Sequence, residues 1–380
     1  MPVYRQEDLL RIAKRVKNTK RSYLLVNPLQ GKHIPVSPAA ALEMMHTLGD
    51  ALAEQYPDTR LVIGFAETAT AVGAAIASRF GGDCVYLPTT REEVPGVRDW
   101  VIFSEEHSHA TLQKLCGDGL GERFEATGSV ILVDDEISTG KTLRNMVLQL
   151  RARYPQLAEK GLVAASLLNR VTPENEGLLA EAGVVCASLV KLTGDRAAEA
   201  AEGFQVEEAA PVEAGSRRWS HLALDCPPLP NPRGGISIRS YLSSCEGLAR
   251  AFEEAAGPLL HGIGGAVVLG TEECMYPALI LGRRLEEGGM AVRCHATTRS
   301  PIGVCSAAGY PITSGARLDS FYEAGRSTYL YNFAPCGALI VVSDAPACRW
   351  EALEQLAAAW APYGYRRLVF VQGGSHVWYI

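Results

Sequence analysis

The chain has 380 residues, of which 47% are hydrophobic and 21% charged, and its formal net charge is −6 at pH 7. Such a composition is typical of a globular protein with a large core, and the length favours two or more domains. No run approaches the roughly 18 apolar residues of a membrane helix, and the basic N-terminal stretch lacks the apolar core of a signal peptide. We therefore expect a cytoplasmic protein with no membrane partner, and the acidic net charge argues against general nucleic-acid binding.

The ten cysteines are dispersed along the chain, with no Cys-x-x-Cys pair. This spacing indicates neither a disulfide framework nor a four-cysteine zinc site. We expect most of them to be buried thiols.

Short β-branched runs alternate with amphipathic segments through the first half of the chain. The strands expected, in chain order, are 23–26, 60–63, 84–87, 101–103, 130–133, 162–168 and 184–189. The helices expected between them are 39–54, 69–80, 142–153 and 174–182. Continuous apolar strands between helices are typical of a parallel sheet that is covered on both faces, so the pattern predicts an α/β domain. In such sheets, ligands bind beyond the carboxyl ends of the strands.

Residues 129–142 combine an apolar strand, two adjacent carboxylates, a hydroxyl-rich turn and a helix start. Asp134 and Asp135, at the carboxyl end of the strand, can reach two neighbouring sugar hydroxyls. The turn that follows offers backbone N–H groups and the positive end of a helix dipole to a phosphate. A simple helix cap is the plainer alternative. A nucleoside-triphosphate loop is excluded, because the position five residues before Gly140 holds Asp instead of Gly.

This stretch resembles the phosphoribosyl pyrophosphate (PRPP) motif of type I phosphoribosyltransferases. The resemblance implies that the two aspartates hold the ribose 2′ and 3′ hydroxyls and that the turn holds the 5′-phosphate. It also implies a Mg²⁺ cofactor that bridges diphosphate and sugar oxygens, with Asp134 and Asp135 as the metal residues. The PRPP-binding candidates of this motif are Asp134, Asp135, Glu136, Ser138, Thr139, Gly140, Lys141 and Thr142.

A second loop follows the strand 60–63 and leads into a helix of small residues. Its candidates are Gly64, Phe65, Ala66, Glu67 and Thr68. Close packing of the helix explains the glycine and alanine residues as well as phosphate binding does. In the family that the motif resembles, the loop at this position contacts pyrophosphate. Two anion-binding loops at neighbouring strand ends favour that role here.

A stretch of mixed charge without a clean period lies between these loops, from residue 89 to residue 110. Loops with acid, base and Gly or Pro breaks are where mobile lids occur, and the family has a flexible catalytic loop in this interval. Arg91 is our candidate for pairing with pyrophosphate oxygens. Glu106 or Glu105 is a candidate for holding metal or orienting a base, and His107 or His109 for donating to the leaving group or the base. A transition-metal site and a solvated loop are the alternatives, although no distant third ligand is signalled.

The second half of the chain repeats the first. Residues 268–274 match residues 62–68 without a gap, and residues 297–299 match residues 89–91. Two matches in the same order indicate a duplicated domain. The counterpart of the PRPP motif, residues 339–346, has Ser343 in place of one Asp and lacks the hydroxyl-rich loop, so we expect no PRPP site there. The predicted organisation is a phosphoribosyltransferase domain at 1–195, a linker at 196–234 and a degenerate α/β copy at 235–380.

Thr298, Arg299, Ser300 and Pro301 form the motif that gives the TRSP domain its name. Nearly the whole chain resembles a bacterial architecture in which an orotate-transferase-like phosphoribosyltransferase is joined to a TRSP domain. The resemblance implies a role in tellurium-resistance and stress gene clusters, in the synthesis of a nucleoside-like metabolite. Arg299 stands where Arg91 stands in the first copy and is the ligand candidate of the second domain, with an ordinary turn as the alternative. A homodimer and an intrachain pseudo-dimer are the assemblies expected.

Together these features predict a Mg²⁺-dependent phosphoribosyltransferase, a pentosyltransferase of nucleotide metabolism. It would transfer a 5-phosphoribosyl group from PRPP to a nucleobase or base-like acceptor and release pyrophosphate. Because C1′ becomes cationic as pyrophosphate leaves, the protein must hold the ribose, neutralise the diphosphate and exclude water. A PRPP- or nucleotide-sensing regulatory or scaffold protein without turnover remains open, as does the reverse cleavage of a nucleotide.

Overall fold

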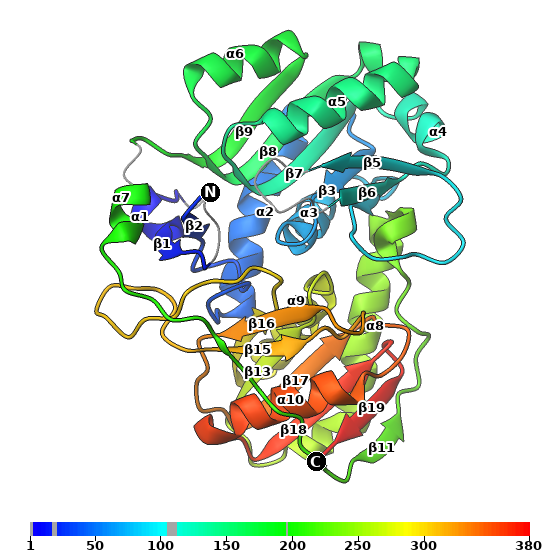
Figure 1. Cartoon of the computed structure of the whole chain (residues 1–380). Helices are drawn as coiled ribbons and strands as arrows, with labels where there is room; N and C mark the ends of the chain where they lie inside the picture. The colour runs from blue at the N-terminus through cyan, green and yellow to red at the C-terminus, as the bar shows by residue number, and fades with distance from the viewer. Residues whose placement is uncertain (1–2, 17–20, 105–111, 195–196) are drawn as a thin grey trace. The chain divides into compact units, whose positions relative to one another are not determined.

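The computed structural model describes residues 3–16, 21–104, 112–194 and 197–380. The chain forms two compact units, each built from separate stretches of sequence (Figure 1). Unit 1 comprises Met1–Gln6, Glu43–Gly194 and Asn231–Leu242. Unit 2 comprises Glu7–Leu42, Asp195–Pro230 and Ser243–Ile380.

The main sheet of unit 1 has the strand order β12-β4-β3-β7-β8-β9. Strands β4, β3, β7, β8 and β9 pair in parallel, whereas the short β12 is antiparallel to β4. Their bounds are β3 Leu61–Gly64, β4 Val85–Pro88, β7 Ser129–Ile137, β8 Gly161–Asn169, β9 Val184–Lys191 and β12 Ile236–Ser237. All four residues of β3 are buried, as a strand covered on both faces requires.

Helices cover this sheet. Helix α5 (Lys141–Arg153) buries Leu143, Met146, Val147 and Leu150, a spacing that places them on one helical face. Figure 1 shows α5 lying across β7 and β8. The other helices of unit 1 are α3 Thr70–Ala77, α4 Leu120–Glu125, η1 Pro155–Glu159 and α6 Pro173–Glu181. A hairpin of β5 (Trp100–Ser104) and β6 (Leu112–Cys116) is inserted between β4 and β7.

Unit 2 is built around a sheet with the order β11-β19-β18-β17-β13-β14. Strands β14, β13, β17 and β18 are parallel, and β19 and β11 are antiparallel. The bounds are β11 Ser220–Ala223, β13 Gly265–Gly270, β14 Ala291–Ala296, β17 Ala338–Ser343, β18 Arg367–Gln372 and β19 His376–Tyr379. Helix α10 (Trp350–Trp360) packs its apolar face on the strands, and Figure 1 shows it in front of β17 and β18.

The remaining elements belong to unit 2, apart from η2 and the first residue of α1. They are α1 Gln6–Leu9, which starts in unit 1, β1 Arg11–Lys14, β2 Tyr23–Val26, α7 Ala197–Glu202, β10 Ala210–Pro211, η2 Pro232–Gly234 of unit 1, η3 Gly257–Leu260, α9 Tyr276–Glu287, β15 Gly315–Asp319, β16 Ser327–Tyr331 and η4 Ala361–Tyr363. Two long helices, α2 (Pro38–Gln55) and α8 (Ile238–Ala256), contain the boundary between the units.

The structure confirms a second α/β copy. The parallel order β4-β3-β7-β8 of unit 1 recurs as β14-β13-β17-β18 in unit 2, and the hairpin β5–β6 recurs as β15–β16. In both copies a helix begins six residues after the glycine that ends the central strand. Helix α3 begins at Thr70 after Gly64 of β3, and α9 begins at Tyr276 after Gly270 of β13. The copies differ at both edges. At one edge the parallel β9 is replaced by the antiparallel β19, which β11 extends; at the other, β12 pairs with β4, whereas β14 carries the isolated bridge between Cys294 and Val36.

The compact units differ from the predicted domain boundaries. The segment predicted as a linker contributes β10 to the hairpin sheet of unit 2 and β11 to the main sheet of unit 2. Strand β12, which follows this segment, extends the sheet of unit 1. Residues 7–42 belong to unit 2, where Val36 bridges Cys294 at the edge of β14. The composition of this segment suggested a connector, but its short strands pair with edges that only the folded sheets provide.

The predicted elements of the first half lie close to their predicted positions, whereas the sequence pattern did not predict α1, β1, β6, α4 and η1. Strand β7 continues past Val133 to Ile137, because β8 still pairs with it after β3 has ended. The basic N-terminal segment contains a strand, Arg11–Lys14, that pairs with Tyr23–Val26.

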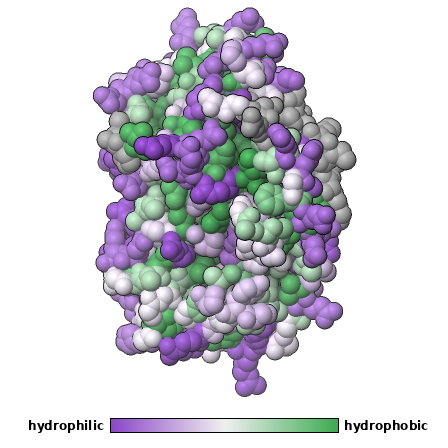
Figure 2. All heavy atoms as spheres, turned by 90° about the vertical axis from the view of Figure 1, so that its left-hand side faces the viewer, coloured by the Kyte–Doolittle hydropathy of each residue, from purple (hydrophilic) through white to green (hydrophobic). Residues whose placement is uncertain are grey.

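None of the helices in the described part of the chain combines the length and apolarity that a bilayer crossing requires. On the face in Figure 2, hydrophilic residues are interspersed with smaller hydrophobic areas. All ten cysteines are free, and half of them are buried.

Candidate active site

The two loops singled out in the first half meet at the carboxyl ends of neighbouring strands. Strands β3 and β7 are adjacent and parallel, so their ends lie at the same edge of the sheet. The hydroxyl of Thr68, in the loop after β3, donates to Oδ1 of Asp135 on β7 at 2.6 Å. The structure thus brings the 64–68 loop and the carboxylate pair into direct contact.

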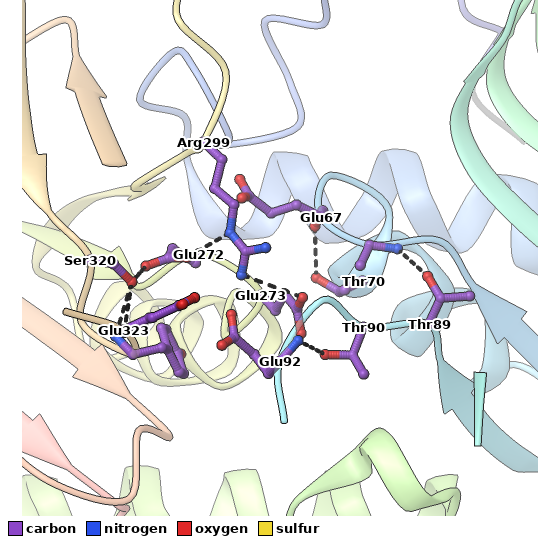
Figure 3. Close-up of polar contacts among 12 residues, drawn as sticks. Glu67, Thr70, Thr89, Thr90, Glu92, Glu272, Glu273, Arg299, Ser320 and Glu323 are labelled. Atoms are coloured by element: carbon purple, nitrogen blue, oxygen red, sulfur yellow. Dashed lines mark hydrogen bonds and ion pairs between the residues drawn. The ribbon is translucent and has the colours of Figure 1, made fainter. Parts of the chain in front are cut away.

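Three external groups fix the backbone of the 64–68 loop. The N–H of Phe65 donates to the carbonyl oxygen of Val133 at 2.9 Å. The N–H of Ala66 donates to the hydroxyl of Thr89 at 2.8 Å, an interaction drawn at Thr89 in Figure 3. The side-chain amide of Gln113 donates to the carbonyl oxygen of Ala66 at 2.7 Å. Both polar groups of residue 66 are therefore used inside the protein, and the loop is held in a defined shape.

The glycines of this region allow α3 to approach β3 closely. A Cβ atom on Gly73 would lie 2.9 Å from the Cα atom of Gly64, a distance that real side chains do not adopt. The hydroxyl of Tyr86 donates to the carbonyl oxygen of Thr70 at 2.7 Å and fixes the first turn of the helix. Helix packing thus explains these glycines, whereas the position of the intervening residues at the strand end is what suits a ligand.

Asp134 and Asp135 are half-buried on the last part of β7. Oδ1 of Asp134 accepts a hydrogen bond from the N–H of Asp135 at 2.9 Å. Glu136, Ser138, Thr139 and Thr142 are also half-buried, and Lys141 is exposed. The segment therefore presents carboxylates and hydroxyls at the edge of the sheet where ligands of such folds bind.

The turn after β7 leads directly into α5. Gly140 caps the helix in the left-handed conformation, with a φ of 72°, and α5 then runs from Lys141 for 13 residues. Glycine adopts this conformation without the steric penalty of a Cβ atom. The N-terminus of a helix of this length favours a bound anion through its N–H groups and dipole.

Arg91 is half-buried and follows the end of β4. The neighbouring Thr90 forms an antiparallel bridge with Lys114 of β6, and its hydroxyl accepts from the N–H of Glu92 at 2.9 Å (Figure 3). These contacts fix the turn that carries Arg91. The other catalytic candidates, Glu105, Glu106, His107 and His109, lie outside the described residues.

The carboxylate pair suits a magnesium ion that is shared with a phosphorylated substrate. Among the described residues, no group of three or more His, Cys, Asp or Glu side chains is arranged to hold a metal alone. Mg²⁺ usually keeps several waters and binds through one or two carboxylates plus substrate phosphates. Asp134 and Asp135 supply two adjacent carboxylates at the strand end, so the residues present fit this mode of binding.

Arg299, the candidate of the second copy, takes part in an internal ion pair. Its Nε donates to Oε2 of Glu272 at 2.8 Å, and its Nη2 lies 3.7 Å from Oε1 of Glu273 (Figure 3). Asp344 and Ser343 occupy the end of β17, the counterpart of the aspartate pair, as expected from the sequence.

Sequence reasoning missed two residues that shape the candidate site. Gln113 and Thr89 hold the backbone of Ala66, and both are fully or almost fully buried. Thr89 carried a signal, because the Thr-Thr-Arg run containing it recurs at residues 297–299. Gln113 carried none, since a single amide in a short strand has no characteristic spacing.

Two family models match successive parts of the chain. Residues 9–195 match the family model described as phosphoribosyl transferase. Residues 245–359 match the model described as the TRSP domain C-terminal to that transferase. No curated protein matches the chain.

Several solved structures are similar to about half of the chain. Adenine phosphoribosyltransferase from Giardia lamblia, in complex with 9-deazaadenine, is 16% identical over 48% of this chain and 94% of that chain, with a TM-score of 0.36. Orotate phosphoribosyltransferase from Aeropyrum pernix is 20% identical over 49% of this chain and 89% of that chain, with a TM-score of 0.32. By its sequence, the chain thus matches the phosphoribosyl transferase family over residues 9–195 and the TRSP domain over residues 245–359, in that order.

Proposed function

We propose that unit 1 transfers a 5-phosphoribosyl group from PRPP to a nitrogen of a nucleobase or base-like acceptor, with release of pyrophosphate. The observation that carries the proposal is the hydrogen bond between Thr68 and Asp135, which joins the two loops at one sheet edge. A substrate with a ribose between a 5′-phosphate and a 1′-diphosphate needs such paired sites. In a cell, this chemistry would take place in the cytoplasm and would serve the synthesis of a nucleoside-like metabolite.

Each part of the site has a role in this proposal. The carboxylates of Asp134 and Asp135 accept hydrogen bonds from the ribose hydroxyls, which fixes the sugar. The turn at residues 138–142 and the N-terminus of α5 bind the 5′-phosphate. The 64–68 loop and Arg91 bind the diphosphate, where negative charge increases as the bond to C1′ breaks.

The metal would add to these contacts. Mg²⁺ bound at Asp134 and Asp135 would neutralise diphosphate charge and favour its departure. The protein's own contribution is to position the ribose and the leaving group, because C1′ needs no protein nucleophile. Glu106, His107 and His109 remain the candidates for proton transfer to the leaving group or the base.

Two measurements test the proposal. Calorimetric titration with PRPP and Mg²⁺ should show one site per chain, which the double variant Asp134→Asn/Asp135→Asn loses. Labelled pyrophosphate should then exchange into PRPP when the acceptor base is present in a panel of nucleobases. Saturable PRPP binding without exchange under any base would favour a sensor, and absence of PRPP binding would refute both functions.

A further inference from the structure

Unit 2 contains a carboxylate that is completely removed from solvent at the start of the loop after β13. Glu272 has 0% of its surface exposed, and its backbone φ is 48°. L-residues rarely adopt a positive φ, and such a conformation persists only where the surroundings hold it. A buried charge and a strained backbone at one residue indicate that its side chain is held in place by strong partners.

Residue 272 occupies the same place in its copy as Ala66 in unit 1. The N–H of Glu272 donates to the hydroxyl of Thr297 at 2.9 Å, as that of Ala66 does to Thr89. The preceding N–H, of Thr271, donates to the carbonyl oxygen of Val342 at 3.2 Å, matching the bond from Phe65 to Val133. The two loops therefore share a backbone frame, and at this position a methyl group is replaced by a carboxylate.

The carbonyl oxygen of the same residue is also satisfied in both copies, but by different groups. Gln113 donates to Ala66 in unit 1, whereas the fully buried Lys32 donates from Nζ to Glu272 at 2.9 Å in unit 2. Lys32 also donates to the carbonyl oxygen of Thr297 at 2.8 Å. Through these two bonds to backbone carbonyl oxygens, Lys32 holds the frame of the loop in place.

Three side chains donate to the Glu272 carboxylate. Nε of Arg299 donates to Oε2 at 2.8 Å, and the hydroxyl of Ser320 donates to Oε1 at 2.5 Å (Figure 3). Nη2 of Arg326 also donates to Oε2, at 3.0 Å. The two arginine side chains are only 11% and 18% exposed. Two guanidinium groups and a hydroxyl around one anion are a donor set suited to a phosphate-type oxyanion.

We propose that this loop of unit 2 is an oxyanion site that the chain fills with its own Glu272 carboxylate. The ligand class that the donors suit is inorganic phosphate or another compact phosphate-type anion. While Glu272 is in place, Arg299 and Arg326 are neutralised from within, and the TRSP domain takes up no anion here. Arg299 of the TRSP motif thus acts as a partner of Glu272.

Two variants that remove the same charge separate this proposal from a purely structural ion pair. Glu272→Gly removes the carboxylate, leaves space for an anion and relieves the unfavourable φ. Glu272→Gln also removes the charge but leaves the space filled. Both should lower the thermal midpoint, by about 10 °C for the glutamine variant, because two largely buried guanidinium groups lose the buried carboxylate that they share.

Inorganic phosphate is the probe that distinguishes an anion site from a purely structural ion pair. Phosphate should raise the midpoint of Glu272→Gly by several degrees more than that of the wild type, and Glu272→Gln should respond as the wild type does. Glu323→Gln is the matched control: Glu323 also pairs with Arg326, at 2.8 Å, but its side chain is 64% exposed. This variant should change neither the midpoint nor the response to phosphate.

Comparison with the wild type removes any effect of phosphate on unit 1, which all variants share. Equal shifts for the glycine variant, the glutamine variant and the wild type would overturn the proposal. If Glu272→Gly does not fold alone, refolding with phosphate decides the matter, since recovery supports an anion site and failure contradicts it.

Discussion

Gln113 donates its side-chain amide to the carbonyl oxygen of Ala66 at 2.7 Å, across 47 positions of sequence. The side-chain oxygen Oε1 of Gln113 accepts a hydrogen bond from the hydroxyl of Thr89, and that hydroxyl in turn accepts from the N–H of Ala66. This closed set of bonds connects β6 with the loop that we assign to the diphosphate. Gln113 is therefore a positioning residue for that loop.

Replacing Gln113 with Leu should weaken PRPP binding about tenfold, because it leaves the buried carbonyl of Ala66 and hydroxyl of Thr89 without their partner, at about 1–3 kcal/mol. Gln113→Glu keeps the acceptor for Thr89 but loses the donor to Ala66, so its affinity for PRPP should lie between those of the wild type and Gln113→Leu. Titration calorimetry with PRPP measures both. Gln156→Leu, which removes an exposed amide contact with Glu125, is the control. Equal affinities for wild type and Gln113→Leu would contradict the positioning role.

Asp134→Asn and Asp135→Asn should each reduce PRPP affinity by roughly 1.5–3 kcal/mol, because each removes an anionic acceptor from the ribose hydroxyls while preserving shape. Asp135 also accepts from Thr68, so its variant should additionally loosen the 64–68 loop. Glu174→Gln, on an exposed position of α6, serves as the charge-matched control. Calorimetry that finds unchanged affinity in both aspartate variants would remove the central claim.

Arg91→Ala should lower the rate of pyrophosphate exchange by tenfold or more, with little change in PRPP affinity, if the guanidinium acts mainly when the diphosphate leaves. The comparison needs exchange kinetics and calorimetry on the same preparation. Arg98→Ala, in the same interval of the chain, is the control. A variant that binds PRPP poorly but exchanges at the normal rate once saturated would make Arg91 a ground-state binding residue.

Gly140→Ala should destabilise unit 1 by about 1–2 kcal/mol, because alanine is strained at positive φ. The added Cβ would also lie 2.7 Å from Cδ1 of Leu179, although that side chain can move. Gly177→Ala is the opposite control, since it lies within α6 with open space around it and should stabilise by up to about 1 kcal/mol. Chemical denaturation of both variants checks the signs. Stabilisation by Gly140→Ala would show that the turn is free to change its conformation.

His295 should make unit 2 sensitive to mild acid. Burial, aided by the positive charge of Lys32, lowers the pKa of His295 from 6.5 to about 4. The unfolded chain therefore takes up a proton as the pH falls through 6.5, whereas the folded protein takes it up only near pH 4. Stability is complete above pH 6.5 and falls by up to ~3 kcal/mol as the pH drops to about 4.

The variant His295→Gln tests this dependence. A glutamine amide retains a donor for the carbonyl oxygen of Tyr331, to which His295 Nε2 lies at 2.6 Å, but does not titrate. Denaturation at pH 7 and pH 5 should show a smaller loss for the variant than for the wild type. An identical loss in both proteins would assign the acid sensitivity to other groups.

The sequence predicted the parts of the fold that depend on local pattern. Apolar runs such as Leu61–Gly64 and the helical spacing of Leu143, Met146 and Leu150 identify buried strands and one-sided helices without knowledge of their partners. The aspartate pair and its turn were recognisable because their chemistry requires adjacent residues. The position of the 64–68 loop beside the aspartate pair also followed, since parallel strand ends meet at one edge of a sheet, but the hydrogen bond from Thr68 to Asp135 did not.

Contacts that join distant positions could not be predicted in this way. Nothing near Lys32 indicates that its ammonium group ends against Glu272 and Thr297, more than 230 residues away. The same holds for β10 and β11, whose short strands gain hydrogen bonds only from sheets assembled by other segments. The second copy was visible in its sequence, but the internal partner of Arg299 was not.

Each unit includes a segment from the other half of the chain, and this has a consequence for synthesis on the ribosome. The edge strand Ile236–Ser237 of unit 1 is synthesised after the other strands of that sheet. Val36 can form its bridge in unit 2 only after Cys294 has been synthesised. Neither unit can therefore acquire its last native strand while the nascent chain ends near residue 200. A gene cut at that point would encode two fragments, each carrying an arm that belongs to the other, and we expect them to regain structure only when present together.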